Sequence, residues 1–131
     1  MISNIPIYRA KKIDSNDYII GYLKFDRKHN HYSINPIDDE NTWHKIKENT
    51  LSIHFPDMLD SQGNKIFASL QEDGKGGDCT FTQNGYNEVF CWDALNACVV
   101  LKSKHYECKC FRNGNRNETT FNTYTIVGIL Q

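Results

Sequence analysis

Apolar and polar residues alternate along most of this chain in short runs, a pattern typical of β-strands. Residues 18–25 are apolar or aromatic at nearly every position, which predicts a strand covered on both faces. The polar residues 26–30 predict a turn, and residues 31–34 return as the second strand of a hairpin. Residues 5–10 predict an earlier strand, in which Pro6 favours a sheet edge or a strand start.

Further short strands are expected on both sides of a central turn. They cover residues 43–46 and 51–55 before it, and residues 79–82, 87–92, 97–101, 106–111 and 121–130 after it. Residues 45–49 could instead form one helical turn, and residues 65–70 fit either a strand or a helix. Asn84-Gly85 is the strongest hairpin signal in the chain. No amphipathic helix of three or more turns is indicated, so helix should be minor.

The central turn is predicted at Asp60-Ser-Gln-Gly63. An aspartate can accept a hydrogen bond from its own backbone two residues on, and a glycine tolerates a positive φ. Ile66 and Phe67 follow directly, and we expect both side chains to be anchored in the core.

These strands predict an α+β fold that is predominantly β, formed by residues 1–131 as a single domain. Two subdomains are expected within it. Residues 1–70 should form an N-terminal antiparallel sheet, and residues 78–131 a small twisted β-barrel of SH3-like type packed on that sheet.

Four segments, taken in order, resemble the YopX family of bacteriophage and prophage proteins. One is the stretch ending in Asp60-x-x-Gly63-x-x-Ile66-Phe67, which is similar to an Asp-x-x-Gly-x-x-Ile-Phe/Tyr segment of that family. The segments cover residues 7–21, 53–67, 88–100 and 124–129. The resemblance implies a YopX-like fold, a phage or prophage origin and self-association. It implies no activity, because the family has no established chemistry.

Composition narrows the classes of partner. The formal net charge of −1 argues against a generic DNA-binding protein. Residues 99–131 are nevertheless basic, with five Lys and Arg against two Asp and Glu. No apolar run approaches the roughly 20 residues that cross a bilayer, and the N-terminus lacks the features of a secretory signal. We therefore expect no membrane association and a location in the cytoplasm of the bacterial host.

The five cysteines all lie in the second half of the chain, at positions 79, 91, 98, 108 and 110. Their odd number and the absence of an export signal predict reduced thiols that pack as small apolar residues. Cys108 and Cys110 with His105 offer soft metal ligands. The usual zinc-site spacings are missing, so no metal is expected.

A glycine-rich segment, residues 72–78, is the most conspicuous candidate for a ligand site. Its backbone N–H groups could cradle an anion. The residues concerned are Asp73, Gly74, Lys75, Gly76 and Gly77. The segment is not a P-loop, and the acidic residues around it would repel an anion. A flexible, solvated turn is the favoured interpretation.

A second candidate is a basic binding surface near the C-terminus. It comprises Lys102, Lys104, Lys109, Arg112 and Arg116. With neighbouring aromatic residues it could follow a single strand of nucleic acid. Without a clear aromatic platform, a solvated face is the favoured interpretation.

No pairing of a nucleophile with a base, and no cofactor motif, is evident in the sequence, so we expect neither an enzyme nor a bound cofactor. The leading hypothesis is a non-catalytic phage or prophage accessory protein that binds a host protein, in host takeover or counter-defence, and associates with itself. The alternative is a binder of a small nucleotide or a nucleic acid through residues 72–78 and the basic C-terminal surface.

Overall fold

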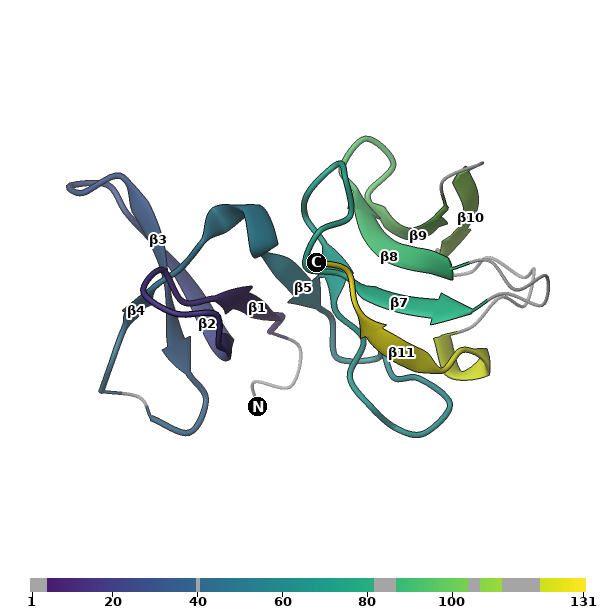
Figure 1. Ribbon diagram of the computed structural model, residues 1–131, viewed down its shortest axis with the longest axis horizontal. Coiled ribbons are helices and arrows are strands. Elements are labelled where there is room, and N and C mark those ends of the chain that lie inside the picture. Colours follow the sequence, from purple (N-terminus) through teal and green to yellow (C-terminus); the bar gives the residue numbers. More distant parts are fainter. Residues whose placement is uncertain (1–4, 40, 82–86, 104–106, 112–120) are drawn as a thin grey trace.

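The computed structural model describes residues 5–39, 41–81, 87–103 and 121–131, together with the backbone of residues 107–111. Within these residues the protein is predominantly β, as expected: eleven strands form one curled sheet, and the helical structure is limited to two 3-10 turns (Figure 1). The strands are β1 (Ile7–Lys11), β2 (Tyr18–Asp26), β3 (His31–Pro36), β4 (His44–Lys45), β5 (Ser52–His54), β6 (Ala68–Ser69), β7 (Asp78–Phe81), β8 (Asn87–Asp93), β9 (Cys98–Lys102), β10 (Glu107–Phe111) and β11 (Ile126–Ile129). The 3-10 turns are η1 (Glu48–Thr50) and η2 (Phe121–Thr123).

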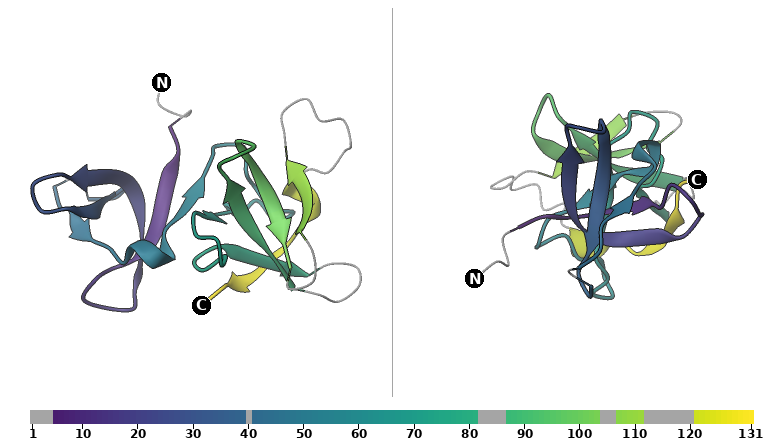
Figure 2. Two further views of the ribbon diagram at one scale, coloured as in Figure 1. Left: turned by 90° about the horizontal axis from the view of Figure 1, so that it is seen from above. Right: turned by 90° about the vertical axis from the view of Figure 1, so that its left-hand side faces the viewer.

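The strands gather in two lobes that lie side by side along the long axis of the molecule (Figures 1 and 2). The N-terminal lobe contains β1–β5, and the C-terminal lobe contains β6–β11. The sheet order is β10-β9-β8-β6-β5-β1-β2-β3-β4, and β7 pairs with both β8 and β11. The short strand β6 therefore joins the lobes, because it pairs with β5 on one side and β8 on the other.

The N-terminal lobe curls until its ends meet. β2 and β3 form the expected hairpin, and β3 continues to β4. A bridge between Lys12 and Ile46 then joins the end of β4 to the end of β1, and the Ile13 N–H donates to the Lys45 carbonyl at 2.9 Å. The enclosed apolar side chains are those of Ala10, Ile19, Ile34, Ile46 and Leu51.

The core of the C-terminal lobe forms around Phe90, which is fully buried. Phe121 and Tyr124 both pack on it, with ring centroids 6.1 and 5.8 Å away. Residues three apart share one side of a helical turn but face opposite sides of a strand. The strand expected over residues 121–130 is therefore wrong in its first part, where η2 replaces it, and correct in its second, where β11 lies.

The central turn is confirmed. Gly63 has a φ of +81°, and the Asp60 carboxylate accepts hydrogen bonds from the N–H groups of Gln62 and Asn64 at 2.9 and 2.8 Å. Asp60 also accepts the N–H of Ile126 at 3.1 Å, so the turn also anchors the start of β11. Burial alone would raise the pKa of Asp60, but these backbone donors hold that pKa below its usual value. Ile66 and Phe67 are buried as predicted.

Among the cysteines whose side chains are described, the prediction of a reduced thiol is wrong for Cys98. Cys98 is disulfide-bonded, whereas Cys79 and Cys91 are reduced. Asn84-Gly85 lies outside the described residues.

No helix in the described part of the chain is long and apolar enough to cross a membrane.

Candidate functional site

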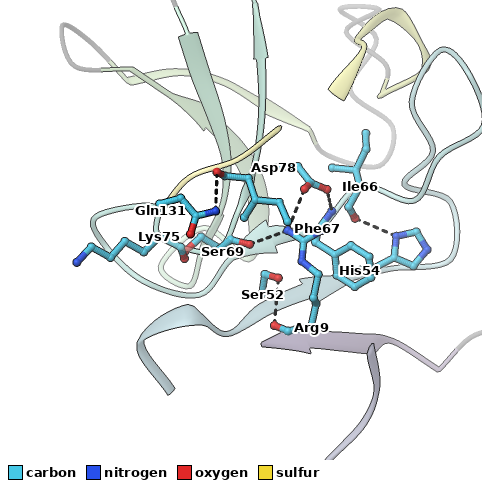
Figure 3. A network of polar contacts seen from close by, with 11 residues as sticks. Arg9, Ser52, His54, Ile66, Phe67, Ser69, Lys75, Asp78 and Gln131 are labelled. Atoms are coloured by element: carbon cyan, nitrogen blue, oxygen red, sulfur yellow. Dashed lines mark hydrogen bonds and ion pairs between the residues drawn. The ribbon is translucent and has the colours of Figure 1, made fainter. Parts of the chain in front are cut away.

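A buried polar network occupies the junction between the two lobes (Figure 3). Arg9 of β1 is only 7% exposed, and its Nη2 donates to Asp78 Oδ1 at 2.9 Å and to the Gly76 carbonyl at 2.7 Å. The other carboxylate oxygen of Asp78 accepts the N–H of Phe67 at 2.8 Å. The Arg9 guanidinium also lies 4.5 Å from the centre of the Phe67 ring. One side chain of the N-terminal lobe thus holds three positions of the C-terminal lobe.

Further hydrogen bonds surround this ion pair. Ser52 Oγ donates to the Arg9 carbonyl at 3.3 Å, and Ser69 Oγ donates to the Lys75 carbonyl at 2.7 Å. His54 Nδ1 lies 2.9 Å from the Ile66 carbonyl oxygen, which can only accept, so Nδ1 carries the proton. The polar groups of β5 and β6 therefore stabilise the same junction.

The titration behaviour of the network follows from its burial. Desolvation raises the pKa of Asp78, although the Arg9 guanidinium and the Phe67 N–H act in the opposite direction. Desolvation also disfavours the charged form of His54, so it lowers the pKa of that residue and keeps the imidazole neutral. Both Asp78 oxygens already accept hydrogen bonds within the protein. The arrangement is suited to stabilising the lobes against each other.

The glycine-rich segment folds into this junction. Gly74, Gly76 and Gly77 are buried, so the interpretation of residues 72–78 as a solvated turn is wrong for these three glycines. Asp73 and Lys75 remain exposed, with 4.0 Å between Lys75 Nζ and Asp73 Oδ2.

Five N–H groups of this segment have acceptors inside the protein. The Gly74 N–H donates to the Gln71 carbonyl, and the Lys75 N–H donates to Asp73 Oδ1. The N–H groups of Gly76, Gly77 and Asp78 donate to the carbonyls of Leu130, Gly74 and Phe67, respectively. In this conformation none of these five N–H groups is available to cradle an anion.

A pocket of about 380 Å³ lies beside the segment. Its apolar surface includes Val89 and Leu130, and its polar residues include Glu72, Asp73 and Lys102. The Cys79 thiol also lines it, but burial raises the pKa of that thiol, which disfavours the reactive thiolate.

The basic surface can be placed only in part. Lys102 lies in β9. Lys109 lies in β10, of which only the backbone is described, and Lys104, Arg112 and Arg116 lie outside the described residues. The same holds for His105 and for the side chains of Cys108 and Cys110. Among the described residues, no group of three His, Cys, Asp or Glu side chains is placed to hold a metal ion.

The structure also presents a surface that the sequence analysis missed. In β2, Ile19 faces the interior, so by alternation Ile20, Tyr22 and Lys24 face outward. Ile20 is 38% exposed and Lys24 is also exposed, so the prediction that this strand is covered on both faces is wrong. We call the set of Ile20, Tyr22, Lys24, Trp43 and Lys45 the outer strip.

The neighbouring strand explains the form of the outer strip. Ser33 of β3 lies between Lys24 and Lys45 in register, so both lysines point to the same side. Lys24 Nζ lies 4.4 Å from the centre of the Trp43 ring. Asn35 Nδ2 donates to the Thr42 carbonyl at 2.7 Å and so fixes the segment that precedes Trp43.

A groove of about 470 Å³ begins at the Ile20 end of the outer strip. Its residues are Lys12, Tyr18, Ile19, Ile20, Pro36, Ile37, Asp38 and His44. Ile37 is 48% exposed, and its N–H donates to the Ile20 carbonyl at 3.4 Å. The outward alternation of Ile20, Tyr22 and Lys24 is visible in the sequence, but which face of the strand is covered is decided by the closure of the lobe.

Comparison with known proteins assigns no family. No protein-family model matches this chain, and no curated protein or solved structure matches it either.

Proposed function

We propose that this chain is a non-catalytic bacteriophage or prophage accessory protein that acts by binding a host protein. The phage context rests on the four segments that resemble the YopX family. The binding role is supported by one structural observation: exposed apolar and aromatic side chains gather on the N-terminal lobe, at the groove and along the outer strip. Aromatic and aliphatic side chains beside a recess are the usual anchors of protein interfaces.

The polar residues that first suggest chemistry have structural roles. Arg9, Asp78 and the glycine-rich segment hold the lobes together, and Asp60 holds β11. The nucleotide-binding alternative has less support, because the N–H groups of residues 74–77 already have acceptors.

The test is affinity capture from a bacterial lysate with quantitative mass spectrometry. We expect one host protein to be enriched by the wild type and to be reduced about tenfold with the Ile20→Ser/Ile37→Ser variant, since these residues flank the groove. The matched control is Phe81→Ser/Leu95→Ser, which changes two exposed residues of the other lobe, 58% and 96% exposed. Enrichment of no host protein above the tag alone would refute the proposal.

A further inference from the structure

We infer that the outer strip binds an extended, acidic segment of the partner protein, with an apolar side chain of that segment at the Ile20 end and its carboxylates at the lysine end. This inference rests on the proposed function and specifies the chemistry of the partner.

The apolar end is formed by the groove and its rim. Ile20 and Ile37 both line the groove and are 38% and 48% exposed. Two large apolar side chains at one recess remove apolar surface from water when an aliphatic side chain enters it.

The cationic end is formed by Lys24 and Lys45. They flank Ser33 in register, one strand away on each side, and both are exposed. Neither lysine forms an ion pair with any described residue. Two cations on one face that form no ion pair with a described residue favour an anionic partner and fix its register.

The distance between the two ends defines the partner segment. Ile20 and Lys24 lie four residues apart on one strand, which is roughly 13–14 Å at the usual rise of a β-strand. An extended segment that follows the strip therefore needs an apolar residue and an acidic residue four positions apart. Side chains four apart in an extended segment point to the same side, so one face of the segment satisfies both ends.

Charge and stacking favour a protein segment over single-stranded nucleic acid. The two lysines of the strip lie at one end, and the groove at the other end contains Lys12 and Asp38 together, so it offers no net positive charge to a phosphate backbone. In addition, the Lys24 ammonium covers one face of the Trp43 ring, which a base would need for stacking.

The first test uses defined peptides and 15N-labelled protein. The probe is a ten-residue Gly/Ser peptide with leucine at position 3 and glutamate at position 7, together with its reversed order, because the segment can follow the strand in either direction. We expect saturable NMR shift changes at β2 and β4 with one of these orders, and none with lysine in place of glutamate. A lack of shift changes with both orders at millimolar peptide, or equal changes with the lysine peptide, would overturn the inference.

The second test uses charge reversal. We expect Lys24→Glu/Lys45→Glu to weaken binding of the glutamate peptide at least about tenfold while the melting temperature is unchanged. The matched control is Lys75→Glu, which reverses an exposed lysine of the other lobe and should change binding by less than about twofold. Equal loss in both proteins would overturn the inference.

The third test separates the two proposals. Captured host protein that binds the Lys24→Glu/Lys45→Glu variant as tightly as the wild type would refute the outer strip and leave the proposed function standing. Tighter binding of fifteen-residue oligothymidine than of the glutamate peptide, lost in the same variant, would assign the strip to nucleic acid instead.

Discussion

Arg9 and Asp78 form an ion pair whose side chains are only 8% and 2% exposed. Removal of one partner leaves the other charged group buried without its counter-ion. We expect Asp78→Ala to lower the free energy of unfolding by about 3–5 kcal/mol, measured by urea titration. The control is Asp73→Ala at the exposed Asp73–Lys75 pair, which should change it by about 0–1 kcal/mol. Equal effects of the two substitutions would show that the buried pair does not hold the lobes together.

His54 makes the stability depend on pH. Burial lowers the pKa of His54 in the folded protein below the reference value of 6.5. As the pH falls, His54 is therefore protonated in the unfolded chain before it is protonated in the folded protein. The stability that neutral His54 contributes is therefore complete above pH 6.5 and is lost as the pH falls through the folded pKa. We expect urea titrations from pH 8 to pH 5 to show a steeper loss of stability in the wild type than in His54→Gln. The raised pKa of Asp78 makes the stability depend on pH in the opposite direction. Because both proteins contain Asp78, its contribution cancels when their free energies of unfolding are subtracted.

At the level of elements, alanine substitutions at two glycines distinguish the cost of backbone strain from the cost of a steric clash. Gly63 and Gly76 have φ values of +81° and +83°, so alanine is strained at both. An added Cβ would meet nothing within 4 Å at Gly63, but at Gly76 it would collide with the Thr50 carbonyl oxygen. We expect Gly76→Ala to destabilise the protein by about 1–3 kcal/mol more than Gly63→Ala, measured by thermal unfolding. Equal melting temperatures would contradict the packed position of the glycine-rich segment.

Local patterns predicted most of the strands. The hairpin of β2 and β3 and the Asp60–Gly63 turn depend on residues close in sequence, and both are where the pattern places them. The glycine-rich segment was misinterpreted because its acceptors come from distant positions: Gly76 donates to Leu130 and accepts from Arg9. The outer strip was missed for a related reason, since no local pattern says which face of β2 the curled lobe encloses.

At the level of the whole molecule, self-association remains a prediction. The sheet ends at β10, and β11 pairs only with β7 among the described strands, whereas the end of β4 is bridged to the end of β1. Edge strands with unpaired backbone groups favour pairing with a second copy. We expect light scattering to report a mass that is a multiple of 15.2 kDa, and a single-chain mass at high concentration would contradict this.

The pairing of β7 with β11 has a consequence for how the chain folds during synthesis. The strands of the N-terminal lobe lie within residues 7–54, so their pairing can form early, whereas residue 126 is added 48 residues after residue 78. At translation rates of 5–20 residues per second, that interval is roughly 2–10 s. A nascent chain on the ribosome would therefore display the outer strip before the second half of the molecule exists, and the proposed host partner would meet that strip while translation continues.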